Sequence, residues 1–419
     1  MLKFFKKINL VNLLILASEI EIYYINIGFS LMAFQVFSIF LFIGLLFKRK
    51  VNNPLKNLKK GIKPAIIPLI GFMLTMFLAI VAHNFEKVSL RHYIFMIWVL
   101  LTVIIYFIYV NNSKELIKST KFLLFVGFVI SVAGTLIFFL YLLGNNLLIS
   151  TREGKGLIYM DLIHNRGRLR LFNSDPNAYA AYMLPLLFNA IGWFFINVKK
   201  RRLIYGVLLS ILLILINLVF TFSRAALISL SVALLLMVFL LVVYKNYNDA
   251  FSLFSSFLFS FIIFIFILKL INVDPNYILS GFYFRQPFEE SRYIKWIQTL
   301  NIIKNNLFWG IGEGNLSRQL GFQAHNSFLE LLAENGIFPF IFLLWFIIEV
   351  LFKSIKIAHN LFYNKDLRAY MLLSNTIGFV ALIIVMFSVS ILTLIYFWFY
   401  AMLILVMANI FFREKDKII

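Results

Sequence analysis

Long apolar runs separated by short polar segments make up nearly the whole chain. A transmembrane α-helix needs about 20 predominantly apolar residues, and each run has roughly that length. The pattern predicts an all-α polytopic membrane protein with about twelve transmembrane helices, in a single integral membrane domain over residues 1–419. The runs lie near 8–25, 27–47, 64–83, 92–110, 121–143, 177–197, 203–222, 225–244, 251–272, 335–352, 369–387 and 392–411. The first run is the weakest, because Glu19 and Glu21 interrupt it.

The composition supports this class and excludes others. Of the 419 residues, 62% are hydrophobic and 14% are charged, which excludes a disordered chain, a coiled coil and a large soluble domain on an anchor. The apolar residues come in unbroken runs rather than in alternation, so the pattern also excludes a membrane β-barrel.

Positive charge is concentrated in alternate loops. The formal net charge is +21, and about 25 of the 39 Lys and Arg residues lie in loops on the side of both termini. By the positive-inside rule both termini face the cytoplasm, so the chain is expected in the plasma membrane with membrane lipids as partners. The cations are not interleaved with aromatic residues as on a base-stacking surface, so nucleic acid is not an expected partner.

This orientation leaves two long polar segments on the outer face, residues 144–176 and 273–334. Both are rich in Gly, Asn, Asp and Arg, and long loops in a compact bundle are commonly functional. The chain has no Cys, which excludes thiol chemistry, and it lacks the metal-binding and phosphate-cradling motifs. We therefore expect a site on the outer face that uses neither a metal nor a cofactor.

The junction between two runs carries the first candidate, Arg224, which follows Thr221, Phe222 and Ser223. One interpretation is an interfacial anchor that ends two helices. The other is an anion ligand, because hydroxyls beside a planar guanidinium match phosphate oxygens. A helix that starts just after Ser223 adds free N–H groups at the same place. The pattern alone leaves both interpretations open.

The 273–334 loop is expected to contain short helices. Residues 291–300 have apolar positions at helical spacing, typical of an amphipathic helix on the bundle or in the membrane interface. Residues 310–314 are rich in Gly and predict a turn. The pair Asn335-Gly336 is typical of a helix end before the next apolar run.

The second candidate is His325, which stands immediately before a helix start. Asn326 or Ser327 can cap this short helix, and Glu330 and Glu334 lie one turn apart on one of its faces. The ordinary pKa of a His side chain suits proton transfer near neutral pH. A lone His is more often a structural hydrogen-bonding residue, so spacing alone does not decide its role.

These motifs together resemble a known family. They are Asp175-Pro176-Asn177, Ser223-Arg224-Ala225-Ala226, Arg292 with Trp296 four residues on, Gly310-Ile311-Gly312, and His325-Asn326 followed by Leu329, Leu331, Glu334 and Gly336. In this order, and with twelve spans and a large late outer loop, the sequence resembles the O-antigen polymerase and O-antigen ligase superfamily of membrane glycosyltransferases. The likeness in motifs covers about residues 170–350, and the likeness in topology covers the whole chain.

The resemblance implies transfer of a glycan from an undecaprenyl diphosphate carrier to a sugar hydroxyl at the outer face, without a metal. It implies that Arg224 and Arg292 hold the lipid diphosphate and that His325 accepts or positions the proton of the attacking hydroxyl. Weaker candidates for phosphate or sugar contacts are Ser223, Arg168, Arg170, Arg318 and Asn326. The implied partners are an undecaprenyl diphosphate-linked oligosaccharide and, as a candidate, a chain-length regulator.

Several activities fit these expectations. A polymerase moves the growing glycan onto the next lipid-linked repeat unit, whereas a ligase moves the finished glycan onto a lipid core. The bias toward Phe, Ile, Lys and Asn favours a Gram-positive source without such a core, and hence a polymerase for capsule, exopolysaccharide or O-antigen. A flippase for lipid-linked oligosaccharides is the main rival from another class, but transporters collect polar residues at mid-membrane. A scaffold without catalysis would need neither Arg224 nor His325.

Overall fold

The structure, a computed structural model, describes residues 24–26, 30–32, 63–110, 112–144, 149–150, 156–161, 166–171, 173, 175–200, 204–270 and 291–415. Eight of the described helices are long and apolar enough to cross a membrane, so the chain is an all-α polytopic membrane protein. It divides into two compact units. Unit 1 comprises residues 1–37, 112–283 and 355–385, and unit 2 comprises residues 38–111, 284–354 and 386–419.

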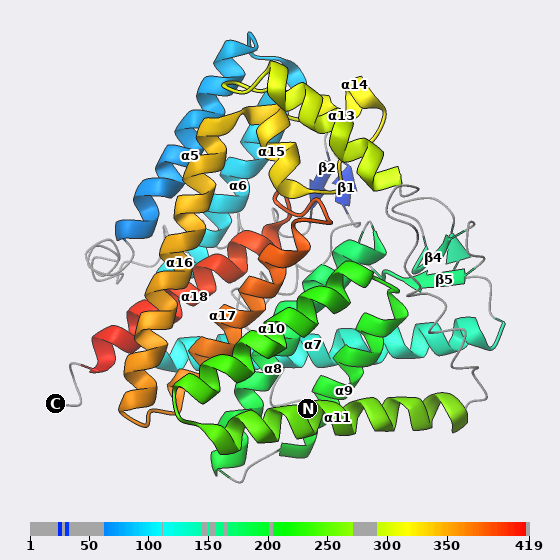
Figure 1. Cartoon of the computed structure of the whole chain (residues 1–419), viewed down its shortest axis with the longest axis vertical. Coiled ribbons are helices and arrows are strands. Elements are labelled where there is room, and N and C mark those ends of the chain that lie inside the picture. The colour runs from blue at the N-terminus through cyan, green and yellow to red at the C-terminus, as the bar shows by residue number, and fades with distance from the viewer. Residues whose placement is uncertain are drawn as a thin grey trace. The chain divides into compact units, whose positions relative to one another are not determined.

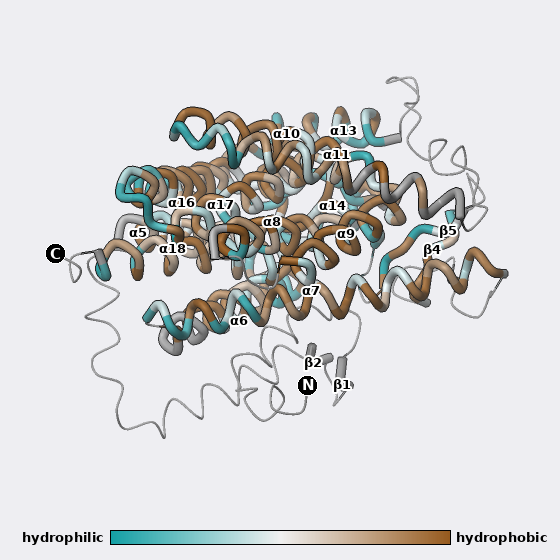
Figure 2. The backbone as a smooth tube through the Cα atoms, turned by 90° about the horizontal axis from the view of Figure 1, so that it is seen from below, coloured by the Kyte–Doolittle hydropathy of each residue, from teal (hydrophilic) through white to brown (hydrophobic). Residues whose placement is uncertain are grey.

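Unit 1 is a helical bundle whose core is the contact between two helices, α8 and α17 (Figure 1). Its helices are α7 (Ser113–Leu142), α8 (Pro176–Lys200), α9 (Ile204–Phe220), α10 (Arg224–Val243), α11 (Tyr247–Leu270) and α17 (Arg368–Val385), with the end of α16 (Ile337–Tyr363). Figure 2 shows hydrophobic residues along α7, α9 and α11. These apolar helices match the runs from which spans were predicted.

Polar side chains tie three helices of unit 1 together. The Asn217 side chain accepts from the Tyr179 hydroxyl at 2.8 Å and donates to the Thr135 hydroxyl at 2.9 Å, which links α9 to α8 and α7. Gly134 lies so close to Asn217 that a Cβ at position 134 would stand 2.0 Å from its side-chain oxygen. A small residue and an interhelical hydrogen bond are the usual means of close packing between membrane helices.

A small sheet occupies part of the 144–176 segment. Strand β4 (Ile158–Asp161) pairs antiparallel with β5 (Arg166–Leu169), and β3 (Ile149–Ser150) pairs parallel with β4. The Tyr141 hydroxyl at the end of α7 accepts a hydrogen bond from the Gly167 N–H at 2.8 Å. The sheet is therefore attached to the helix that precedes it in the chain.

Unit 2 combines long helices with three short ones. The long helices are α5 (Lys63–Ala82), α6 (Lys87–Tyr109), the first part of α16 and α18 (Ile395–Lys415), and the short ones are α13 (Ser291–Asn305), α14 (Asn315–Leu320) and α15 (Ser327–Asn335). Trp398 of α18 is fully buried, with ring centroids 5.5 Å from Phe72 of α5 and 5.8 Å from Phe346 of α16. This aromatic cluster packs α18 against α5 and α16 within unit 2.

The ten predicted spans from residue 64 onward each coincide with one helix, α5 to α11 and α16 to α18. Most of the first two predicted spans, 8–25 and 27–47, lies outside the described residues. Within them β1 (Tyr24–Asn26) pairs antiparallel with β2 (Ser30–Met32), so a helix over the whole of 27–47 is wrong. Aromatic and β-branched residues such as Tyr24 and Ile25 favour extended backbone. The total of twelve spans and the single membrane domain stay predictions.

Candidate functional site

The junction between α9 and α10 is a tightly organised helix start. Ser223 is the N-cap of α10, and its buried hydroxyl accepts from the Ala226 N–H at 3.4 Å. The Thr221 hydroxyl is also buried, donates to the Leu218 carbonyl at 2.6 Å and accepts from the Ser223 N–H. Arg224 is the first helical residue and is partly exposed. Both hydroxyls are thus engaged with the backbone, and Arg224 stands at the positive end of the helix.

Arg168 connects this junction to the start of α8. Its Nε donates to the Thr221 carbonyl at 2.9 Å and its guanidinium donates to the Asn177 side-chain oxygen at 3.0 Å. Asp175 in turn accepts from the Asn177 backbone N–H at 2.7 Å and from its amide group at 2.9 Å. The motif Asp175-Pro176-Asn177 therefore lies next to the residue stretch that leads into Arg224.

Arg170, another predicted contact residue, has 0% of its surface exposed. Its Nε donates to the Gly156 carbonyl at 3.3 Å, and its guanidinium lies 5.8 Å from the centre of the Tyr159 ring. These contacts hold the sheet segment together. A role for Arg170 in binding substrate stays a prediction.

In unit 2, His325 occupies the turn before α15. Asn326 is the N-cap, and its side chain accepts from the N–H groups of Phe328 and Leu329, both at 3.1 Å. His325 has φ +53°, a left-handed conformation that costs a non-glycine residue about 1–2 kcal/mol. Such strain persists only where the surroundings enforce it, and it is common at functional sites.

Helix α13 is one of the elements that enforce this turn. The Trp296 indole N–H donates to the Ala324 carbonyl, immediately before His325, at 2.9 Å. Trp296 also packs against a buried cluster of Ile303, Leu316, Ala324 and Ala333. Arg292 lies one helical turn before Trp296 on the same helix.

The segment between α17 and α18 is the second element that enforces the turn at His325. The Ser327 hydroxyl donates to the Val389 carbonyl at 2.8 Å and accepts from the Ile391 N–H at 2.9 Å. The Ser327 N–H donates to the Met386 carbonyl at 2.9 Å. The first residue of α15 is therefore fixed to residues 386–391.

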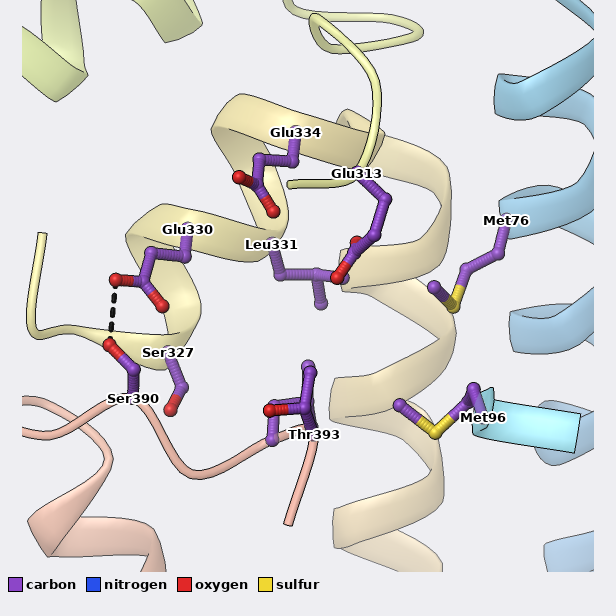
Figure 3. A pocket seen from close by; sticks show the side chains of 10 residues that line it. Met76, Met96, Glu313, Ser327, Glu330, Leu331, Glu334, Ser390 and Thr393 are labelled. Atoms are coloured by element: carbon purple, nitrogen blue, oxygen red, sulfur yellow. Dashed lines mark hydrogen bonds between the residues drawn. The ribbon is translucent and has the colours of Figure 1, made fainter. Parts of the chain in front are cut away.

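A cavity of about 40 Å³ lies between these elements. Glu313, Glu330 and Glu334 line it, together with the hydroxyl groups of Ser327, Ser390 and Thr393 and the apolar side chains of Met76, Met96, Leu331 and Leu392 (Figure 3). Such a volume has room for water but not for a sugar ring. No three His, Cys, Asp or Glu side chains of the described residues are placed to hold a metal ion.

Two of these carboxylates hold segments in place. The Glu334 carboxylate accepts from the Leu316 N–H at 3.0 Å, and the Glu313 carboxylate accepts from the Asn335 amide group. Burial raises the pKa of Glu334 well above its ordinary value, and the Glu313 carboxylate raises it further. Burial raises the pKa of Glu313 as well. Burial and the proximity of the two carboxylates therefore both favour the protonated form of the pair.

Glu330 contacts the His325 turn directly. One of its oxygens accepts from the His325 backbone N–H at 3.1 Å and from the Ser390 hydroxyl at 2.6 Å. Burial raises its pKa from 4.5 to about 7, and the two hydrogen bonds oppose part of that rise. Glu330 therefore changes its charge near neutral pH.

Arg318 lies in α14, the helix that follows the Gly-rich turn at residues 310–314. It is exposed, pairs with Glu86 and donates to the Asn315 side-chain oxygen at 3.2 Å. The Asn315 amide group and Arg318 lower the pKa of Glu86. The His83 ring nitrogen lies 3.1 Å from the Gly310 carbonyl, so the turn between α5 and α6 contacts the 310–320 segment. Loops predicted on one face of the membrane thus lie together within unit 2.

The predicted site residues fall into two groups. Arg168, Ser223 and Arg224 lie together in unit 1, where Arg168 donates to the Thr221 carbonyl, and Arg292, His325 and Asn326 all belong to unit 2. A common site that joins the two groups stays a prediction. The sequence reasoning missed Glu313 and Ser390 as neighbours of Glu330 in the cavity, because only the spacing of Glu330 and Glu334 on one helix face was visible in the sequence.

The fold and these clusters define a multi-pass membrane protein with polar groups gathered at helix starts and in short helices between spans. Residues 208–344 match a family model described as O-antigen ligase. This match covers about a third of the chain and includes Arg224, Arg292 and His325. It confirms the resemblance to the O-antigen polymerase and ligase superfamily and indicates glycan processing at a membrane. A search of curated proteins found no match.

Proposed function

We propose that this protein is a metal-independent membrane glycosyltransferase that polymerises undecaprenyl diphosphate-linked oligosaccharide repeat units into a surface polysaccharide at the outer face of the plasma membrane. The observation that carries the proposal is that the matched segment 208–344 contains both a cation at a helix start and a His in an enforced left-handed turn. A cation at the positive end of a helix and a non-glycine residue in a left-handed turn each cost free energy, and packing alone does not require either placement.

In the proposed reaction, the acceptor sugar hydroxyl attacks the anomeric carbon of the donor glycan. The new bond joins the acceptor oxygen to that carbon, the bond from the carbon to the phosphate oxygen breaks, and undecaprenyl diphosphate leaves with the electron pair. His325 takes the proton of the hydroxyl. Arg224 and Arg292 bind the diphosphate and neutralise the charge that develops on it as it leaves.

The surroundings of Arg224 support its role as an anion ligand. Ser223 caps α10, so the first free N–H groups of that helix and the guanidinium of Arg224 lie at one end of one helix, an arrangement that favours phosphate. Arg168 fixes the Thr221 carbonyl just before it. In this proposal Arg168 orders the junction, and Arg224 contacts the donor.

A ligase is the second candidate, because the matching family is described by that activity. It would use the same leaving group and the same proton acceptor, and it would differ in the acceptor that it binds. A flippase would need neither a leaving group nor a proton acceptor. Because the matching family is described by a ligase activity, it does not favour a flippase.

Reconstitution separates these functions. Liposomes that contain the protein are given undecaprenyl diphosphate-linked repeat units and EDTA, without any other acceptor, and the products are separated on a gel. We expect a ladder of glycan lengths. Product that forms only after a lipid core is added would indicate the ligase. Units of unchanged mass that become accessible to a membrane-impermeant sugar oxidant such as periodate on the other leaflet would indicate the flippase.

A further inference from the structure

We infer that Glu330 is a positioning residue for His325: its carboxylate, held by the Ser390 hydroxyl, fixes the turn that presents the His325 side chain during glycan transfer. This inference rests on the proposed function and adds a positioning residue to the same site.

The first observation is which N–H group donates to the Glu330 carboxylate. In an ordinary capping box, a Glu at the third helical position reaches back to the N–H of the N-cap residue. Here Glu330 is the fourth helical residue of α15 and its carboxylate reaches the N–H of His325, the residue before the cap. The hydrogen bond therefore acts on the residue with φ +53°.

The second observation is that α15 does not need this bond for its own start. Asn326 already accepts from two N–H groups of the first turn. Ser327 is already fixed to Val389 and Ile391 through its hydroxyl. What Glu330 adds is a constraint on His325 and a connection to Ser390.

The third observation is that an ionised Glu330 is costly where it lies. It lines the cavity beside Glu313 and Glu334, and the Glu313 carboxylate disfavours its negative charge. His92 of α6, 4.0 Å from Glu313, is a further ionisable group that faces this cluster. A residue chosen for stability alone would be neutral here, since a buried charge without a cation is unfavourable.

Glu330 also titrates near neutral pH, and its ionised form is the stronger hydrogen-bond acceptor. The turn is therefore held most firmly above about pH 7. Since His325 must also be unprotonated to accept a proton, the acid side of the rate profile of the wild type depends on about two ionisations.

The test uses the full-length protein in liposomes with undecaprenyl diphosphate-linked repeat units, at pH values from about 5.5 to 8.5, which bracket the pKa of about 7 of Glu330. We expect Glu330→Gln to lower kcat about tenfold at pH 8, with KM changed less than about twofold. The acid side of its rate profile should depend on about one ionisation. Ser390→Ala should move the midpoint to higher pH, because the Ser390 hydroxyl lowers the pKa of Glu330.

Two matched variants serve as controls. Ser390→Thr keeps the hydroxyl and should keep the wild-type midpoint. Thr393→Val removes a different hydroxyl of the same cavity and should not shift it. Wild-type profiles for Glu330→Gln and Ser390→Ala would overturn the inference while leaving the proposed function intact.

A readout without substrate keeps the inference testable if the wild type makes no product, in which case the proposed function itself fails. The rate at which diethyl pyrocarbonate modifies His325, followed by mass spectrometry, reports the conformation of the turn. We expect Glu330→Gln to change this rate at least about twofold at pH 8 and Thr393→Val to leave it unchanged. Equal rates in the wild type and Glu330→Gln would refute the positioning role.

Discussion

The indole N–H of Trp296 donates a hydrogen bond to the carbonyl of Ala324, 28 residues later in the chain. This bond joins α13, which carries Arg292, to the turn that carries His325. Water cannot freely replace the bond, since Ala324 is fully buried. The bond therefore connects the helix that carries Arg292 with the turn that carries His325.

Trp296→Phe should destabilise the protein by about 1–3 kcal/mol, because it leaves the buried Ala324 carbonyl without its donor. Thermal unfolding in detergent measures the change. Trp309→Phe is the control, since Trp309 is exposed and its replacement should change stability by less than about 0.5 kcal/mol. Equal effects of the two substitutions would contradict the role of the Trp296 bond.

Stability and activity should depend on pH in opposite directions. The Glu330 carboxyl has a pKa of about 7 in the folded state, against 4.5 for an unperturbed Glu side chain, so the folded state binds an additional proton between these values. The free energy of unfolding therefore falls as pH rises from about 4.5 to 7, by about 3 kcal/mol for this group, and stays low above pH 7. Glu313 and Glu334 act in the same direction.

Unfolding temperatures measured from about pH 5 to 8.5 test this prediction. Glu330→Gln should flatten part of the dependence and raise stability at pH 8, although it lowers the rate of transfer. A protein whose stability rises steadily with pH over this range would be inconsistent with buried carboxyl groups that hold protons.

The chain packs closely at Gly336, the residue that ends α15. It has φ +82°, and a Cβ added there would lie 2.1 Å from the Phe308 carbonyl oxygen. Gly336→Ala should therefore cost at least about 3 kcal/mol, from backbone strain and a clash with main-chain atoms. Gly321 also has a positive φ, of +73°, but its Cβ would meet nothing within 4 Å.

Gly321→Ala is thus the matched control and should cost only the strain, about 1 kcal/mol. Chemical denaturation of both variants in the same detergent gives the comparison. If Gly336→Ala were as stable as Gly321→Ala, the close approach of the chain segments at residues 308 and 336 would be refuted.

Arg168 and Arg224 should differ in what they contribute to stability. Arg168→Ala removes hydrogen bonds to the Thr221 carbonyl and to Asn177 and should cost about 1–3 kcal/mol. Arg224→Ala removes a cation from the positive end of α10, where the helix dipole disfavours it by about 0.3–1 kcal/mol. Arg224→Ala should therefore destabilise the protein less than Arg168→Ala does, and a loss of folded protein comparable to that of Arg168→Ala would contradict this assignment.

The long helices could be predicted from the sequence because one physical constraint determines them. A span in lipid must be apolar over about 20 residues and must satisfy its backbone internally, and ten apolar runs from residue 64 onward each form a helix. The start of α15 at Asn326 and its end at Gly336 were also predictable, because capping residues act locally.

Contacts between distant segments could not be predicted in the same way. Ser390 is 60 residues from Glu330, and no periodicity connects them. Strands β4 and β5 were missed because four-residue strands give too short an alternation to recognise. The burial of Arg170 was missed as well, since the sequence shows a cation in a polar loop but not the chain that encloses it.

The measurement that tests the central claim most directly compares the products of the wild type, Arg224→Ala and His325→Ala in liposomes with undecaprenyl diphosphate-linked repeat units as donor and acceptor. We predict a ladder of glycan lengths from the wild type and a loss of at least about 100-fold in rate for each variant, with both variants folded. A full ladder from either variant would contradict the assignment of Arg224 and His325 to the transfer reaction.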